Sequence, residues 1–125
     1  MYKIEKIGET HLYVKALGTF PPSVAERFIE EFEERTKDFK SISVIVDGLD
    51  LILLNLKSFE MILDLLKRNN DRLVKSAYII SKNLVLKKEA EILFERADSP
   101  KRKIVENLEE AREWLGIPAV IIERD

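Results

Sequence analysis

The sequence predicts a single α/β domain whose sheet is mixed but mostly parallel, with the element order ββαβαβαβα and a C-terminal tail. Three observations predict it: a hairpin-like start, two short apolar runs at residues 42–46 and 77–80, and helical patterns between the strands. Alternating strands and helices imply right-handed crossovers between parallel strands. A length of 125 residues fits one domain that buries about two-thirds of its surface on folding.

The first two strands are expected to form a β-hairpin. Residues 2–6 and 11–17 alternate in polarity or carry β-branched side chains, and Gly8 with Glu9 separates them. Residues 18–22 contain one glycine and two prolines, and we expect a turn there. The hairpin therefore begins the sheet.

The first helix is expected over residues 22–38. Ser23 and Glu26 have the spacing of a capping box, and apolar residues follow at helical intervals. Residues 42–46 form a continuous apolar run, typical of a strand that is covered on both faces. Asp47 then begins a loop.

The central elements continue the alternation. Apolar residues at helical spacing predict helices over residues 59–66 and 86–97, the second stopped by Asp98, Ser99 and Pro100. Residues 77–80 and 104–105 are expected to be strands. We find no internal repeat and no linker between domains.

The last helix has the clearest local signals. Asn107 is a good N-cap with Glu110 three residues later, and Gly116 supplies the stop. Residues 1–116 are therefore expected to form the domain. Residues 117–125 form an apolar tail, expected to pack on its own domain, with pairing to a second subunit as the alternative.

Composition excludes several classes of function. Without cysteine there is no disulfide, thiolate metal site or cysteine nucleophile, and we expect a cytoplasmic address. A net charge of −2, from 21 basic and 23 acidic residues, gives no global field for nucleic acid. The longest apolar cluster, residues 51–54, is too short for a membrane span.

Catalytic motifs are also missing from the sequence. His11 is the single histidine, so a catalytic triad or a multi-histidine metal site cannot form, and a surface position is expected for it. The four glycines never cluster into a nucleotide-binding loop. We expect no enzyme activity, no cofactor and no metal.

Charge is unevenly distributed along the chain. Residues 20–39 hold six acidic and three basic residues, a net of −3, whereas residues 66–88 hold seven basic and one acidic residue, a net of +6. The simpler interpretation is solvated helix faces and loops. The alternative is a basic face for an acidic partner.

Two features near the middle of the chain are candidates for a site. Asp47 and Asp50 follow a buried strand, where open α/β sheets bind ligands, although both residue types also simply form turns. Residues 49–56 are unusually apolar for a connection. They either fold inward or begin the helix early, or they form an exposed apolar surface for a partner or an amphipathic ligand.

The element order, the strand at residues 42–47 with its loop, the helix from Leu56 and the closing VENLEEAREWL at residues 105–115 resemble the STAS family. The similarity is greatest to its SpoIIAA-like branch, the bacterial anti-sigma factor antagonists. It spans about residues 1–116. The resemblance implies a small α/β domain with a binding role rather than an enzymatic one.

The resemblance also implies a missing phosphorylation switch. Antagonists carry Asp-Ser-Ser-Gly before the second helix, and a serine there is phosphorylated by the partner kinase. This chain has Asn55, Leu56, Lys57 and Ser58 at those positions. Ser58 is expected to be an ordinary hydroxyl of the first helical turn, with phosphorylation one residue late as the alternative. Some SpoIIAA-like proteins instead resemble small lipid-binding folds.

The leading hypothesis is a STAS-like module that binds a protein partner, such as an anti-sigma-like regulator. The alternative is a small amphipathic or lipid-like ligand held under the loop of residues 47–58. A homodimer is a further possibility, and neither nucleic-acid binding nor a membrane span is expected. The residues expected to bind are Asp47, Asp50, Leu51, Leu53, Leu54, Lys57, Ser58, Lys82 and Lys87.

Overall fold

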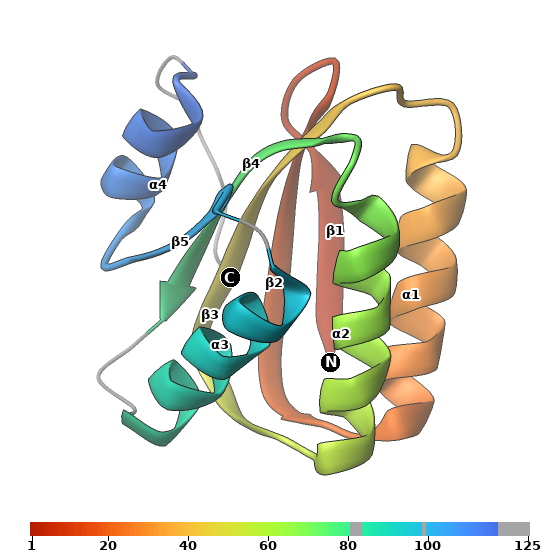
Figure 1. The fold of residues 1–125 in the computed structure, drawn as a ribbon, viewed down its shortest axis with the longest axis vertical. Coiled ribbons are helices and arrows are strands. Elements are labelled where there is room, and N and C mark those ends of the chain that lie inside the picture. Colours follow the sequence, from red (N-terminus) through yellow and green to blue (C-terminus); the bar gives the residue numbers. More distant parts are fainter. Residues whose placement is uncertain (81–83, 99, 118–125) are drawn as a thin grey trace.

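The computed structural model describes residues 1–80, 84–98 and 100–117, which form one sheet with four helices (Figure 1). The strands and helices along the chain are β1 Tyr2–Lys6, β2 His11–Phe20, α1 Pro22–Thr36, β3 Ile42–Leu54, α2 Leu56–Asn69, β4 Leu73–Ile80, α3 Leu84–Ala97, β5 Arg102–Val105 and α4 Leu108–Leu115. The predicted order ββαβαβαβα is confirmed. Every predicted element is present.

The five strands lie in the order β1-β2-β3-β4-β5. The β1–β2 hairpin is antiparallel and the other three pairs are parallel, so the predicted mixed, mostly parallel sheet is confirmed. Each parallel step needs a crossover, and α1, α2 and α3 provide the three crossovers. The C-terminal ends of the four parallel strands, β2 to β5, therefore lie at the same edge of the sheet.

The two faces of the sheet are covered differently. Helices α1, α2 and α3 lie side by side, and α4 stands apart from them beside β4 and β5 (Figure 1). We call the face under α1, α2 and α3 the helical face, where Val14 and Val44 meet Phe28 and Leu65. We call the opposite side the α4 face.

The alternating side chains of the same strands build the core of the α4 face. Tyr13, Ile45 and Ala77 are fully buried there, with Ala111 of α4. Trp114 packs partly buried at the rim, and its Nε1 donates a hydrogen bond to the Ser76 carbonyl oxygen at 3.0 Å. The period of two in the strands thus divides the apolar residues between two cores.

The prediction of a loop after residue 46 is wrong, because β3 continues to Leu54. The expected turn at residues 18–22 is wrong for the same reason, since β2 runs on to Phe20 and pairs with the end of β3. Register shifts interrupt this pairing beyond Lys15, where β3 carries extra residues. A Cβ on Gly48 would lie 3.3 Å from the Ile79 carbonyl oxygen, so glycine suits this crowded position.

Two helix ends differ from the prediction. The expected capping box at Ser23 is wrong: Pro21 is the N-cap of α1, and its carbonyl oxygen accepts from the amides of Val24 and Ala25. Helix α1 then ends at Thr36, two residues early. The strands β4 and β5 begin four and two residues earlier than expected, because backbone pairing with their neighbours extends them.

The C-terminal helix is confirmed in detail. Asn107 Oδ1 accepts a hydrogen bond from the Glu110 amide at 2.9 Å, and Gly116 closes α4 with a φ of 72°, in the left-handed region. Ile117 packs partly buried against the α4-face core. The rest of the predicted tail, residues 118–125, lies outside the described residues.

Candidate functional site

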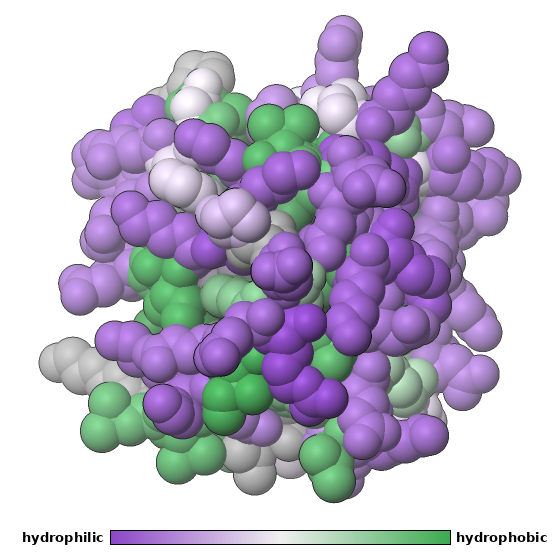
Figure 2. All heavy atoms as spheres, in the orientation of Figure 1, coloured by the Kyte–Doolittle hydropathy of each residue, from purple (hydrophilic) through white to green (hydrophobic). Residues whose placement is uncertain are grey.

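Exposed apolar side chains lie in two groups at the end of the molecule where the parallel strands end, one at the start of α2 and one on α3. Figure 2 shows hydrophobic side chains along this lower edge, at the starts of α2 and α3. We call this surface the apolar end. It consists of the exposed residues Ile52, Leu56, Leu84, Val85 and Ile92.

The predicted apolar segment contributes to both the core and this surface. Leu51 packs partly buried against the helical-face core, while Ile52 is 59% exposed and Leu56 is 73% exposed. The backbones of Leu53 and Leu54 pair with Thr19 and Phe20. The backbone of the segment continues β3 to Leu54 instead of beginning the helix early, and its side chains divide between partly buried ones at Leu49 and Leu51 and exposed ones at Ile52 and Leu56.

Asp47 is completely buried on the α4 face. Its Oδ2 accepts a hydrogen bond from the Tyr13 hydroxyl at 2.5 Å, and its Oδ1 accepts from the Leu49 amide at 3.2 Å. These bonds hold β3 at the position where its register shifts against β2. Asp47 is thus placed to organise the strand rather than to meet a substrate.

Asp50 is more exposed, and it pairs with a buried cation. Its Oδ2 lies 3.7 Å from Lys15 Nζ, whose side chain is only 7% exposed. The two aspartates therefore have different surroundings although they are three residues apart. Among the described residues, no group of three or more histidine or acidic side chains could hold a metal ion.

The positions that correspond to the antagonist motif form the N-terminus of α2. Asn55 caps the helix by accepting a hydrogen bond from the Lys57 amide at 2.8 Å, and the Lys57 side chain is exposed. Ser58 is fully buried, and its hydroxyl donates to the Phe20 carbonyl oxygen at 2.5 Å. Ser58 therefore ties α2 to the end of β2, and a kinase could reach it only after this bond breaks.

The basic residues expected beside this loop are only partly described. Lys87 and Lys88 lie exposed on α3, whereas Lys82 lies outside the described residues. Elsewhere the opposite charges partly neutralise each other, as where Arg68 of α2 lies 3.4 Å from Glu33 of α1. The acidic and basic regions of the sequence thus meet at the α1–α2 contact.

A cavity of about 140 Å³ lies between the sheet and the helices α1, α2 and α3. Its lining is almost entirely apolar and includes Phe20, Val44, Leu51, Leu65 and Leu93. Protein interiors normally leave few voids larger than a water molecule, so this volume is unusual for a small domain. The predicted loop contributes Leu51 and Gly48 to it, but most of the lining comes from the helices and the central strands.

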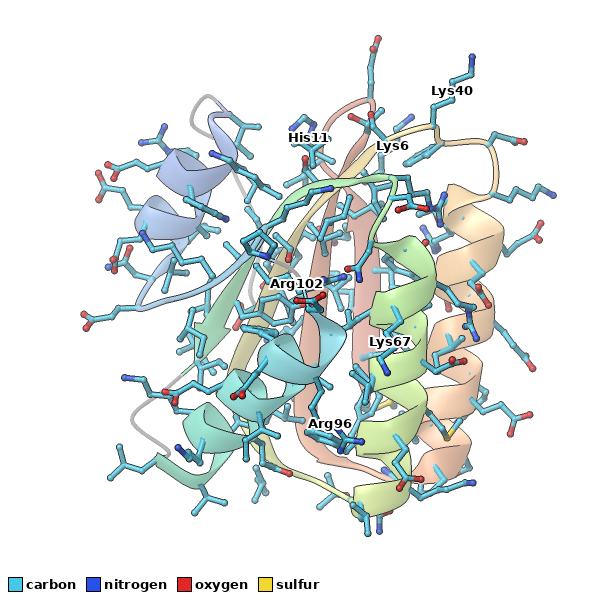
Figure 3. All side chains as sticks on the ribbon, viewed as in Figure 1. Lys6, His11, Lys40, Lys67, Arg96 and Arg102 are labelled. Atoms are coloured by element: carbon cyan, nitrogen blue, oxygen red, sulfur yellow. The ribbon has the colours of Figure 1, made fainter. Side chains whose placement is uncertain are left out.

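Three polar side chains line the same cavity at the β4–β5 side. Ser76 and Arg102 are register partners on these parallel strands, and Tyr78 follows two residues after Ser76 on the same face. Ser76 is 2% exposed and Arg102 is 7% exposed. Figure 3 labels Arg102 in the interior, between α2 and α3.

Arg102 is held by the C-terminal end of α2. Its Nη1 donates to Asn70 Oδ1 at 2.6 Å, and its Nη2 donates to the Leu66 carbonyl oxygen at 3.0 Å. Burial raises the pKa of the nearby Tyr78 hydroxyl above its ordinary value, and the charge of Arg102 and the polar side chains of Ser76 and Arg102 beside the hydroxyl oppose this rise. The polar side of the cavity therefore carries a positive charge beside a neutral phenol.

Ser76, Tyr78 and Arg102 were not among the site residues expected from the sequence. The alternation of β5 could have indicated Arg102, because the first residue of this short strand lies on the same face of the sheet as Ile104. An arginine on such a face must be buried or pack over neighbouring side chains. The partners of Arg102 on α2 could be found only from the packing of α2 beside β5.

The described residues contain no helix that is long and apolar enough to cross a membrane. No protein-family model matches the sequence, and no curated protein matches it.

Solved structures do match this architecture. A crystal structure at 2.25 Å resolution of an uncharacterized DUF3478-family protein from Shewanella loihica PV-4, described as having a SpoIIAA-like fold, is 22% identical with a TM-score of 0.71. The match covers 92% of each chain. The chain has a SpoIIAA-like fold. The anti-sigma factor antagonist SpoIIAA in its unphosphorylated form is 11% identical with a TM-score of 0.66, and the match covers 95% of this chain and all of SpoIIAA.

The SpoIIAA-like fold confirms the resemblance found in the sequence at the level of architecture. The chain shares the arrangement of sheet and helices over nearly its whole length. At these identities the likeness concerns the fold, so the roles of individual residues have to be argued from this chain's own side chains.

Proposed function

We propose that the chain is a non-enzymatic, cytoplasmic regulatory module that binds a protein partner through its apolar end. The observation that carries this proposal is the exposure of large apolar side chains at one end of the molecule, with Leu84 78% exposed and Leu56 73% exposed. Such a patch on a small domain is typical of an interaction surface. The SpoIIAA-like fold supports a binding role, since the similar SpoIIAA is an anti-sigma factor antagonist.

Charges around the apolar end define the kind of partner. Lys57, Lys87 and Lys88 are exposed beside its apolar residues. A partner with an apolar centre and an acidic rim would therefore fit this surface. The module would act without the serine switch, because Lys57 stands at the acceptor position and Ser58 is buried.

The test compares the wild type with the double variant L56Q/L84Q. Each protein captures partners from the source organism's lysate, and the partner retained by the wild type is then purified and titrated against both. We expect the double variant to bind at least about tenfold more weakly, because two large contacts are lost.

Val74→Gln is the matched control, since Val74 is also an exposed apolar residue, at 52%, but lies on β4 outside the apolar end. It should leave the affinity unchanged. Equal affinity of the wild type and the double variant would reject the apolar end as the interface.

The cavity supports a second candidate function, the binding of a small amphipathic ligand. Its volume of about 140 Å³ and its apolar lining carry this candidate. Stabilisation of the folded protein by small apolar compounds would test it, since a ligand that binds only the folded state raises the melting temperature.

A further inference from the structure

Two buried polar atoms at the β4–β5 side of the cavity have no hydrogen-bond partner among the described residues. They are Ser76 Oγ and Arg102 Nε, and both side chains line the cavity. Buried polar groups in native proteins are nearly always hydrogen-bonded, so each exception needs an explanation. Asn69, which lines the same cavity, is fully engaged with Leu65 and Arg72.

The charge at this place is also incompletely balanced. Arg102 is only 7% exposed, yet within the described residues its guanidinium forms no ion pair with a carboxylate. Its two bonds go to a neutral amide and to a carbonyl oxygen near the end of α2. These dipoles compensate part of the charge, and burying the remainder is costly without an anion.

A bound carboxylate would supply both the missing hydrogen-bond partners and the missing negative charge. It accepts a hydrogen bond from Arg102 Nε and one from Ser76 Oγ, and it neutralises the guanidinium. Water can satisfy the serine hydroxyl, but it leaves the charge uncompensated. A cationic ligand is disfavoured beside Arg102.

The rest of the cavity sets the size of the ligand. Its volume of about 140 Å³ is close to that of the roughly 150 Å³ engineered apolar cavity that admits benzene. Aromatic and aliphatic side chains, including Phe20 and Leu93, surround this space. The apolar part of the ligand is therefore one aromatic ring or a short aliphatic chain, rather than a full-length lipid.

We propose that the helical-face cavity binds a small amphipathic carboxylic acid, with its carboxylate on Arg102 and Ser76 and its apolar part between the sheet and α1, α2 and α3. The proposal rests on the second candidate function, which it makes specific by naming the head group and its two anchors. It is independent of the apolar end.

The experiment is a calorimetric titration of the full chain with phenylacetate, with its neutral isostere phenylacetamide, and with the cation phenethylamine. We expect phenylacetate to bind at least about tenfold more tightly than the amide, because hydrogen bonds to a charged group are stronger. Phenethylamine should bind most weakly.

The outcomes separate this proposal from the function it rests on. If phenylacetamide binds as tightly as phenylacetate, the cavity still binds ligands but the anion site is wrong. The same holds if phenethylamine binds best. If hexanoate and hexanol also fail to bind, along with all three aromatic compounds, both the anion site and the ligand-binding candidate are rejected.

Substitutions at Arg102 and Ser76 test whether these two side chains bind the carboxylate. Arg102→Gln keeps polar atoms but removes the charge, and it should weaken phenylacetate binding by about tenfold or more. Arg72→Gln is its matched control, because Arg72 is a partly buried arginine that does not itself line the cavity; it is bonded to Thr36, to Phe39 and to the cavity-lining Asn69.

Ser76→Ala decides the matter if Arg102→Gln fails to fold. It removes a buried hydroxyl that has no partner, so the unliganded protein should be as stable as the wild type or more stable, while its affinity for phenylacetate falls about fivefold. Ser43→Ala, a buried serine of β3 outside the cavity lining, should leave the affinity unchanged. A Ser76→Ala protein that loses stability but keeps its affinity would overturn the proposal.

Discussion

The two faces of the sheet are built from the same strands, yet they treat buried polar groups in opposite ways. On the α4 face, the Asp47 carboxylate is fully buried and accepts hydrogen bonds from Tyr13 and Leu49. On the helical face, Ser76 Oγ and Arg102 Nε are buried beside a cavity and have no partner among the described residues. The difference separates polar groups that shape the fold from the polar groups that we propose as the anchors of a ligand.

Asp47 and Asp50, the two aspartates expected to bind a ligand, have to be interpreted differently in the structure. Carboxylates at the end of a parallel strand are attractive candidates for ligand binding. Here Asp47 has no access to solvent, and its bonds hold the irregular pairing of β2 with β3. The polar groups with unused bonding capacity lie on β4 and β5 instead.

The largest expected effect is that of removing the buried carboxylate. Asp47→Ala takes the acceptor from the Tyr13 hydroxyl and from the Leu49 amide, and we expect the free energy of unfolding to fall by about 3 kcal/mol. Urea denaturation measures this change. Asp64→Ala, which removes an exposed carboxylate paired with Arg68, should cost less than about 1 kcal/mol. Similar losses for the two variants would show that Asp47 does not hold the strand.

A matched pair of alanines tests the packing of the two faces. Ala111 is fully buried in α4, and Ala90 is 8% exposed in α3 and lines the cavity. Ala111→Val should lower the free energy of unfolding by about 1–3 kcal/mol because the site is filled. Ala90→Val should cost less than about 1 kcal/mol, since the cavity accepts the added methyl groups.

Both substitutions carry the same small penalty for a β-branched residue in a helix, so their difference reports packing alone. An equal loss of unfolding free energy in the two variants would contradict the claim that the α4 face is tightly packed while the helical face holds a cavity.

Local patterns predicted the elements well because each element is encoded by neighbouring residues. The α4 helix is the best case, since Asn107, Glu110 and Gly116 lie within ten residues of one another and form the predicted cap and stop. The end of β3 could not be predicted in this way. Residues 47–54 form a strand only because β2 continues beside them to Phe20, which is a non-local pairing.

The site was harder to predict than the fold. Leu56 belongs to the segment of residues 49–56, for which an exposed apolar surface was one of the alternatives, and its side chain is 73% exposed. The polar side of the cavity is built by two strands and one helix from separate parts of the sequence, since Ser76 of β4, Arg102 of β5 and the carbonyl oxygen of Leu66 in α2 meet only in the packed domain. Composition shows Arg102 as one of many basic residues and gives no sign of its burial.

A smaller effect should appear at alkaline pH. Burial raises the pKa of Tyr78 above the ordinary 10.0, with Arg102 opposing the rise, so the folded protein favours the neutral phenol. A raised pKa in the folded state contributes stability that is fully present below pH 10 and is lost as the pH rises toward the folded-state pKa.

Tyr78→Phe keeps the ring that stacks 4.5 Å from Phe94 and removes the titrating group. The stability difference between the wild type and this variant should be constant from about pH 7 to 9 and shift in favour of the variant above pH 10. Urea denaturation at each pH measures it. A difference that stays constant through pH 11 would show that the Tyr78 pKa is the same in both states.

The most direct test of the contrast between the faces is a methyl carbon–proton NMR titration with phenylacetate. The account predicts that the shifted methyl resonances belong to side chains of the helical face, such as Val44, Leu51 and Leu93, which line the cavity. The methyl resonances of Ile45 and Val105, buried in the α4-face core, should stay in place. Shifts concentrated at Ile45 and Val105, or no shift at saturating phenylacetate, would contradict the claim that the helical face holds the ligand site.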